Sequence, residues 1–177
     1  MEIKAKGVFD YESIKSLTHV SMFGRKKPKN SFMRNNIMFA CLLMLLMIEM
    51  IIFGVDVQLI VLLILDALLF AFNCFIYFIM PKIQFNALQQ MKNIENHYIF
   101  SDDIITVTSK NENYTGETQL NYSIICKVIE NSKYVYIFHN KNQVFMVDKS
   151  SIVNGTMEDI KAKILPFVKN KYIICKY

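Results

Sequence analysis

The sequence predicts a membrane α-helical hairpin followed by an α+β domain, in which a small antiparallel barrel or sandwich is closed by a C-terminal helix. The first observation is that Ile37 to Met80 is apolar almost throughout, whereas both flanks are mixed. The second is a series of short runs rich in β-branched and aromatic residues between Tyr98 and Val147, a pattern typical of strands. The third is an amphipathic segment that begins at Thr156 with a capping pair. A chain of 177 residues has room for one small domain beside a membrane segment.

The apolar stretch is about twice as long as the roughly 20 residues that one membrane-spanning helix needs. It therefore predicts two spans, at residues 37–53 and 59–80, separated by a turn at 54–56. We expect Pro81 to end the second span, because proline removes a helical hydrogen bond. The central Asp66 adds about 3 kcal/mol to the free energy of inserting the second span into a membrane. The many Leu, Ile and Phe residues lower this free energy by more, so we expect both spans to insert.

The distribution of cations predicts the orientation in the membrane. The turn between the spans has no Lys or Arg, whereas both outer flanks are basic, which predicts a multi-pass protein with both termini in the cytoplasm. The high Asn, Ile and Lys content suggests a bacterial genome, and hence a bacterial plasma membrane. The cations before the first span could also attract anionic lipid, but fixing the topology is the simpler interpretation. These cations are Arg25, Lys26, Lys27, Lys29 and Arg34.

The second span carries a predicted helix-contact surface, made of a polar face and a neighbouring strip of small residues. Small residues let helix backbones approach closely, and a carboxylate inside lipid is costly unless it is protonated or paired. One interpretation gives Asp66 a proton-linked or partner-recognition role. The other, which we favour, has a protonated Asp66 bonded to the first span or to a second copy of the chain. The surface consists of Asp66, Asn73 and Tyr77 on the polar face and Ala67, Ala71 and Cys74 on the strip.

Four segments are expected along the chain. Residues 1–36 form a cytoplasmic amphipathic and basic segment, in which Asp10 caps a helix over residues 11–23. Residues 37–80 form the transmembrane hairpin, 81–97 a connector and 98–177 the cytoplasmic domain.

The cytoplasmic domain is predicted to contain a series of strands and then one helix. The helix begins at Thr156, with Asp159 completing the cap, and Pro166 ends or kinks it. Residues 169–177 fit either a final strand or a tail. The predicted strands are 98–100, 104–108, 118–122, 125–129, 134–138 and 144–147.

Parts of this domain resemble a known family. The segments YIFSDDIITV at 98–107, LNYSIICKVIE at 120–130, YVYIF at 134–138 and VFMVDK at 144–149 are similar to the YcxB-like bacterial membrane proteins. The resemblance covers roughly residues 30–168 and includes the preceding hairpin. It implies a two-helix membrane anchor and a C-terminal pleckstrin-homology-like (PH-like) domain, and it brings no reaction and no catalytic residues.

No catalytic motif is found in the sequence. It contains no Gly-rich phosphate loop, nucleophile elbow, HExxH motif or EF-hand spacing. The cysteines lack the spacing of a zinc site, and His19, His97 and His139 are expected to be surface or turn residues. We therefore expect no enzymatic activity, no cofactor and no metal. The net charge of +5 is too small to indicate nucleic-acid binding.

Four lysines of the strand region allow two interpretations. They would form an anionic-lipid surface if the fold gathered them on one side. Lysines along exposed strand edges, where they block edge pairing, are the interpretation we favour. These residues are Lys127, Lys133, Lys141 and Lys149.

The leading functional hypothesis is a non-enzymatic membrane protein whose PH-like domain binds a protein or peptide at the bacterial membrane. The hairpin would then serve as anchor and as a surface for self-association. The alternative is an immunity protein that protects its own cell against a membrane-active toxin or bacteriocin. A third hypothesis, a proton-coupled channel or transport accessory, rests on Asp66 and Asn73.

Overall fold

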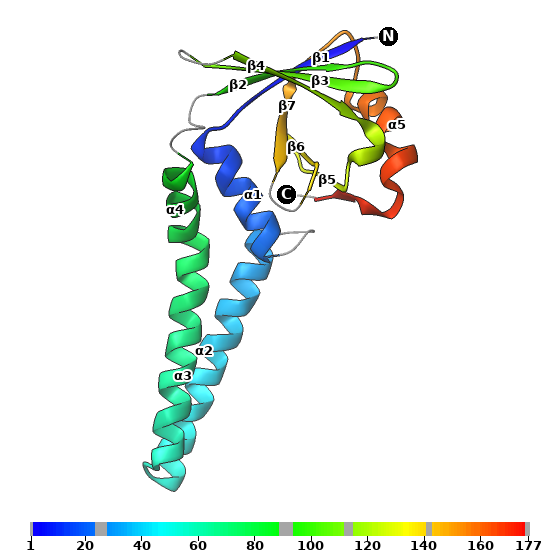
Figure 1. Cartoon of the computed structure of the whole chain (residues 1–177). Helices are drawn as coiled ribbons and strands as arrows, with labels where there is room; N and C mark the ends of the chain where they lie inside the picture. The colour runs from blue at the N-terminus through cyan, green and yellow to red at the C-terminus, as the bar shows by residue number, and fades with distance from the viewer. Residues whose placement is uncertain (1, 24–27, 89–93, 112–114, 141–142, 176–177) are drawn as a thin grey trace.

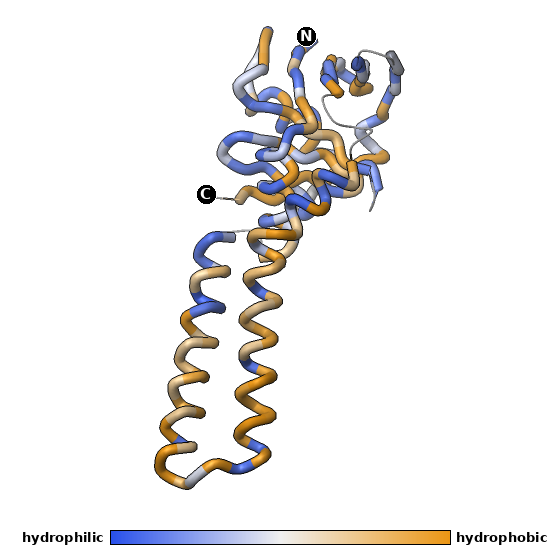
Figure 2. Tube along the Cα trace, turned by 90° about the vertical axis from the view of Figure 1, so that its left-hand side faces the viewer, coloured by the Kyte–Doolittle hydropathy of each residue, from blue (hydrophilic) through white to orange (hydrophobic). Residues whose placement is uncertain are grey.

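The structure is a computed structural model that describes residues 2–23, 28–88, 94–111, 115–140 and 143–175. A long helical hairpin projects from one side of a β domain, which contains both ends of the chain (Figure 1). The hairpin is apolar along most of its length, whereas polar and apolar residues alternate in the domain (Figure 2). The predicted order of two apolar helices, a mostly β domain and a C-terminal helix is confirmed.

The hairpin consists of α2 (Pro28–Phe53) and α3 (Val57–Cys74). The helical stretches Pro28–Phe53 and Val57–Ala87 are long and apolar enough to cross a membrane, and few of their residues are buried. Helices that are apolar all round and exposed need apolar surroundings. Gly54, in the connecting turn, has a φ of 88°, a left-handed conformation that glycine adopts without strain. Composition and exposure together suggest that the hairpin associates with a membrane.

Pro81 does not end the second arm, contrary to the prediction. The helix continues through a π-helical turn, η1 (Phe75–Ile79), into α4 (Met80–Ala87). In this turn the N–H of Met80 donates to the carbonyl of Phe75, five residues earlier. Pro81 then lies in the first turn of α4, where a proline is tolerated. The expected connector is therefore helical as far as Ala87.

The β domain is built on one sheet of eight strands, in the order β4-β3-β2-β1-β7-β6-β5-β8. All neighbouring strands are antiparallel except β5 and β8, which are parallel. The sheet is open, with β4 and β8 at its edges, so the expected closed barrel is not formed. All six predicted strands are present. The strands are β1 (Ile3–Val8), β2 (Glu95–Phe100), β3 (Ile104–Lys110), β4 (Thr115–Asn121), β5 (Lys127–Glu130), β6 (Tyr134–Phe138), β7 (Val144–Val153) and β8 (Tyr172–Ile174).

The N-terminal strand β1, which the sequence analysis did not predict, lies in the middle of the sheet between β2 and β7. Its residues alternate between buried and exposed positions, as expected for a strand with one face on a core. The sheet therefore combines the start of the chain with residues that follow the hairpin. It extends beyond the segment 98–177 that the sequence suggested.

The sheet changes register where β1 meets β7. Lys4 pairs with Val153 and Lys6 with Asp148, so β7 contributes more residues than β1 over this stretch. The Ser151 hydroxyl fills the irregular region: it accepts from the Lys6 N–H at 2.7 Å and donates to the Lys6 carbonyl at 2.9 Å. Such bulges bend a sheet, which lets the two halves of this sheet enclose one core.

Two helices cover the two faces of the bent sheet. α5 (Met157–Val168) buries Ile160, Ile164 and Val168 against the core that both halves share. α1 (Tyr11–Phe23) packs on the opposite face of β5, β6 and β7. Because a helix lies on each side, the first four residues of β6 are all buried.

The predicted helix boundaries agree with the structure at most ends. Asp10 caps α1, accepting the Ser13 N–H at 2.8 Å, and Thr156 and Asp159 form the reciprocal cap of α5. Pro166 lies inside α5, which runs on to Val168. The open choice for residues 169–177 is settled by the short 3₁₀ helix η4 (Lys169–Lys171) and the strand β8. Another 3₁₀ turn, η3 (Tyr122–Ile124), follows β4.

Candidate functional site

Amide side chains join the two helices of the hairpin near the end that carries the sheet. Asn73 Nδ2 donates to Asn36 Oδ1 at 2.6 Å, and Asn35 Nδ2 lies 3.5 Å from Asn73 Oδ1. Hydrogen bonds between amide side chains hold helices together in apolar surroundings. Asn73, which was expected to contact a helix, thus bonds to α2 of the same chain.

Asp66 is buried in the hairpin, where 3% of its surface is exposed. Its Oδ1 atom has no hydrogen-bond partner among the described residues. α2 is the helix that packs along α3, so this carboxyl group lies inside the hairpin and away from its outer surface. A charged carboxylate in such a place is costly.

The strip of small residues lies on the outside of the hairpin. Ala67 and Ala71 are exposed, and Cys74 is half-buried. They present a smooth surface to which another helix can pack closely.

A stack of aromatic rings lies at the end of the hairpin that is next to the sheet domain. The Tyr77 ring lies between the rings of His19 and Phe32, at centroid distances of 4.2 and 4.0 Å and nearly parallel to both. Phe23 and Phe78 pack against this stack edge-on. Because these residues come from α1, α2 and η1, the stack ties the N-terminal helix to both arms of the hairpin.

His19 also bonds to the backbone of the π-helical turn. Its Nε2 atom lies 2.9 Å from the carbonyl oxygen of Tyr77, and a carbonyl only accepts, so Nε2 is the donor. In a regular helix that carbonyl would accept the N–H of residue 81, but residue 81 is a proline. The imidazole therefore satisfies an acceptor that Pro81 leaves open. Burial lowers the pKa of His19 below its ordinary value, despite the opposing effect of this bond.

Helix α1 connects the hairpin to the sheet. On the sheet side, the Tyr136 hydroxyl donates to the Ser13 carbonyl at 3.1 Å, and Asn131 Nδ2 donates to Ser16 Oγ at 2.7 Å. On the hairpin side, the Thr18 hydroxyl bonds to Gln84 of α4. These polar contacts surround the apolar packing of α1, so the hairpin joins the domain through a packed helix and not only through a linker.

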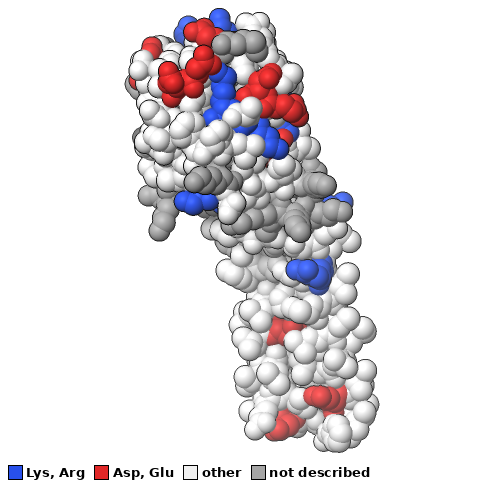
Figure 3. Space-filling view, turned by 90° about the vertical axis from the view of Figure 1, so that its right-hand side faces the viewer, with Lys and Arg blue, Asp and Glu red and all other residues white. Residues whose placement is uncertain are grey.

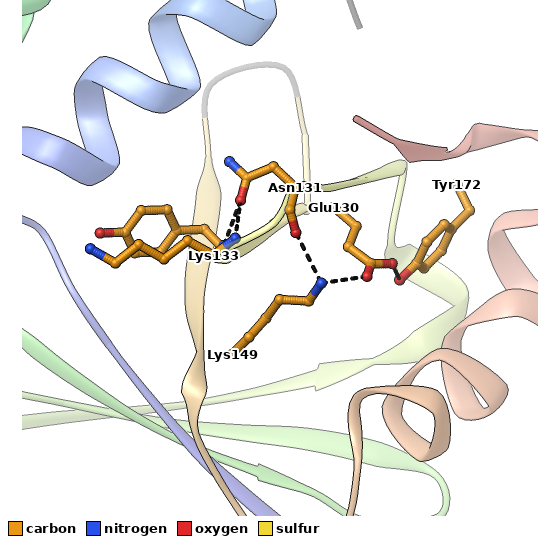
Figure 4. Close-up of polar contacts among 6 residues, drawn as sticks. Glu130, Asn131, Lys133, Lys149 and Tyr172 are labelled. Carbon is orange, nitrogen blue, oxygen red and sulfur yellow. Dashed lines mark hydrogen bonds and ion pairs between the residues drawn. The ribbon is translucent and has the colours of Figure 1, made fainter. Parts of the chain in front are cut away.

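A polar network stabilises the turn between β5 and β6 (Figure 4). Lys149 Nζ lies 2.6 Å from Glu130 Oε1 and donates to the Asn131 carbonyl at 2.9 Å. The Tyr172 hydroxyl donates to Glu130 Oε2 at 2.7 Å. Asn131 Oδ1 accepts the N–H groups of Lys133 and Tyr134. The network joins β5, β7 and β8, and Asn131 extends it to α1.

Electrostatics follow from this geometry. Burial disfavours the charged form of Glu130, but the bonds from Lys149 and Tyr172 outweigh it and hold the pKa of the carboxyl below its ordinary value. Burial and the neighbouring Glu130 raise the pKa of Tyr172 well above its ordinary range. Glu130 is thus an ionised structural group near neutral pH.

The basic residues before the first span are only partly described. Lys29 and Arg34 lie exposed on α2, whereas Arg25, Lys26 and Lys27 lie outside the described residues. On the face in Figure 3, described acidic side chains gather on the part of the domain farthest from the hairpin and within the hairpin itself. Lys and Arg alone are visible between these two regions.

Three of the four lysines noted in the strand region are described, and each has its own contact. Lys149 is paired with Glu130, and Lys133 lies over the ring of Tyr134 at 5.1 Å. Lys127 lies over the ring of Phe138 at 5.0 Å, at the other end of β5. Lys141 lies outside the described residues.

Several residues of the junction were not found by sequence reasoning. His19 is buried in α1, so its expected place on the surface or in a turn is wrong. Asn35, Asn36 and Phe32 contribute contacts from α2 that no motif marks. Pro81 could have indicated one of these contacts. A proline inside a helix leaves a backbone carbonyl without its helical N–H donor, so another group, here His19, is expected to donate to it. Among the described residues, no group of three or more His, Cys, Asp or Glu side chains could hold a metal ion.

Comparison with known proteins supports one of the sequence-based inferences directly. Neither the curated proteins nor the solved structures include a match to this chain. The family model described as YcxB-like protein matches residues 100–164, from the end of β2 into α5. This match confirms the resemblance to YcxB-like proteins over residues 100–164, which follow two apolar helices that could form a membrane anchor.

Proposed function

We propose that the protein is a non-enzymatic integral membrane protein of the bacterial plasma membrane, with both termini in the cytoplasm. Its PH-like sheet domain binds a protein or peptide partner, and the hairpin anchors the complex. The observation that carries this proposal is the open edge of the sheet at β4.

Strand β4 has a neighbour on one side only. It pairs with β3 along its whole length, from Thr115 opposite Lys110 to Asn121 opposite Ile104, and it ends the strand order. The backbone N–H and C=O groups on its other side are a template for one more strand. An extended peptide can bind such an edge through main-chain hydrogen bonds.

The side chains of β4 leave this edge accessible. Five of its seven residues are exposed, and Glu117 is the single charged residue of the strand. Protective features of natural edges, such as lysine or proline, do not occur between Thr115 and Asn121. β4 lies on the side of the domain away from the hairpin (Figure 1), so a cytoplasmic partner can approach it without meeting the bilayer.

Photo-crosslinking in native membranes tests this proposal. A photoreactive residue placed at Thr118 or Gln119, both exposed on β4, should trap a specific protein. The matched control is the same residue at Ala162, which is exposed on α5. Equal patterns from β4 and from Ala162 would contradict a partner at the edge. A trapped membrane-active toxin would favour the alternative function, protection of the cell against its own toxin.

A further inference from the structure

A cavity of about 480 Å³ opens at the opposite end of the sheet from β4, where the starts of β5 and β8 meet the end of β6. Lys127 and Lys171 supply cations to its wall, and Asn140 and Asn170 supply amides. Phe138 and Ile173 form the apolar part. Among the described residues that line the cavity there is no Asp or Glu. Its described wall therefore favours a ligand that carries an anionic group next to an apolar part.

The register of the strands places the two lysines side by side. β5 and β8 are parallel, with Val128 opposite Tyr172, and Lys127 and Lys171 are the residues that come just before this pair. Lys127 begins β5 and Lys171 ends η4, just before β8, and like charges at such neighbouring positions repel each other. An anion between the two ammonium groups would turn this repulsion into attraction.

The end of the sheet that carries the cavity lies on the side of the domain where a membrane surface is expected. The β5–β8 end of the sheet forms the side of the domain from which the hairpin extends (Figure 1). The described charges visible between the hairpin and the far part of the domain are basic (Figure 3). Both observations place this end of the sheet on the same side of the domain as the hairpin, whose arms α2 and α3 are the expected membrane spans.

We propose that this cavity binds a phosphate group, carried either by an anionic phospholipid of the same bilayer or by a small soluble molecule. Lys127 and Lys171 neutralise the phosphate, and the amide group of Asn170 donates to one of its oxygens. Asn140 borders the site, with its own amide bonded to Gln143 at 2.9 Å. Phe138 and Ile173 contact the apolar part of the ligand. The site is separate from the β4 edge, so its failure would leave the proposed partner binding untouched.

Cys126 lines the cavity, so the reactivity of its thiol can report whether a ligand is bound there. Cys126 is exposed, so a water-soluble maleimide should alkylate it at a measurable rate in the full chain in detergent micelles. Peptide mass spectrometry separates this reaction from those of the other cysteines. Phosphatidylglycerol should slow the alkylation of Cys126, whereas the same concentration of zwitterionic phosphatidylcholine should have little effect.

The double variant Lys127→Gln/Lys171→Gln tests the role of the two cations. Each lysine near a phosphate contributes about 1 kcal/mol, so the double variant should weaken protection by roughly 10- to 30-fold in ligand concentration. The charge-matched control is Lys4→Gln/Lys110→Gln, which changes two exposed lysines on β1 and β3. The variant Lys127→Arg/Lys171→Arg keeps both charges and should retain protection, which guards against a loss caused by misfolding.

Inorganic phosphate distinguishes the two sources of the ligand. Protection by phosphatidylglycerol at lower concentration than by inorganic phosphate indicates a lipid headgroup, and the reverse order indicates a soluble ligand. Absence of protection by both overturns the proposal. Equal protection in the wild type and in the double glutamine variant also overturns it.

Discussion

At the scale of single residues, Gly7 shows how strictly the fold depends on one side chain. A Cβ atom at this position would lie 1.7 Å from the carbonyl oxygen of Met146, which is closer than any real contact. The obstacle is a backbone atom, so β1 and β7 would have to move apart at Gly7, next to the register shift between Lys4 and Lys6.

We predict that Gly7→Ala lowers the free energy of unfolding by about 3 kcal/mol, at the upper end of the range for overpacking. Thermal unfolding in detergent micelles measures the effect. The matched control is Gly155→Ala, whose added Cβ would meet only the side chain of Ile3, at 2.8 Å. A side chain can shift more easily than backbone, so Gly155→Ala should lower the free energy of unfolding by less than Gly7→Ala. A smaller loss at Gly7 than at Gly155 would show that β1 and β7 do not approach as described.

Glu130 predicts a dependence of stability on pH. Its pKa in the folded protein lies below the ordinary value of 4.5, because the bonds from Lys149 and Tyr172 outweigh the effect of burial. A carboxyl with a lowered folded pKa stabilises the protein above its unfolded pKa. This stabilisation is lost as the pH falls through the folded value.

Melting temperatures measured from pH 7 down to pH 3 should therefore fall more steeply below about pH 4.5 in the wild type than in Glu130→Gln. The variant should also be less stable at pH 7, because Lys149 loses its ionic partner. Glu117→Gln, on the exposed edge strand, serves as the control and should follow the wild-type curve. Parallel curves for the wild type and Glu130→Gln would rule out a stabilising role of this carboxylate.

At the scale of elements, the π-helical turn and α1 depend on each other. Pro81 has no N–H to offer the carbonyl of Tyr77, and His19 Nε2 lies 2.9 Å from that oxygen. One residue creates the open acceptor and the other satisfies it, although they lie in different helices. This interpretation predicts an energetic coupling that neither single substitution can reveal.

A double-mutant cycle on His19→Phe and Pro81→Ala measures the coupling. Phenylalanine keeps a ring stacked on Tyr77 but cannot donate, so His19→Phe should cost about 1 kcal/mol in the native background. With alanine at position 81 a backbone N–H becomes available, and the same substitution should cost much less. Equal costs in both backgrounds would mean that the imidazole stabilises the junction by stacking alone.

The edge strand β4 gives a second prediction for an element. Successive N–H groups of a strand point in opposite directions, so one of Thr118 and Gln119 donates toward β3 and the other toward the open edge. Proline at the inward position should destabilise the domain. Proline at the outward position should leave the melting temperature of the domain within a few degrees of the wild-type value. It should also abolish crosslinking of the partner to β4. Retained crosslinks in both proline variants would exclude strand addition at β4.

At the scale of the whole molecule, the sequence was informative where a signal is local. The apolar stretch, the caps at Asp10 and Thr156 and the six runs of strand residues were all predictable. Strand β1 was not, because six residues with two lysines and a glycine give a weak signal, and its partners lie beyond the hairpin. The contacts of Asn73 and Tyr77 needed the structure for the same reason, since Asn36, Phe32 and His19 are distant in sequence.

The position of β1 means that the sheet cannot be completed by the chain that follows the hairpin. Residues 94–177 alone would lack the strand that joins β2 to β7, and their two half-sheets would expose the edges that β1 covers. They would also lack α1, which buries one face of β6. Since so much of each core comes from the start of the chain, we expect this fragment to remain unfolded.

Fusing residues 1–23 to 94–177 through a flexible linker, in place of the hairpin, should restore the fold. The linker replaces a connection but leaves β1 and α1 free to reach their places in the sheet. A dispersed amide NMR spectrum from the fused chain, and a collapsed one from 94–177, is the expected result. The control is the fused chain with Gly7→Ala, which should lose dispersion because β1 can no longer lie against Met146. A folded spectrum from 94–177 by itself would show that β1 is an accessory strand, and that the hairpin and the sheet fold independently.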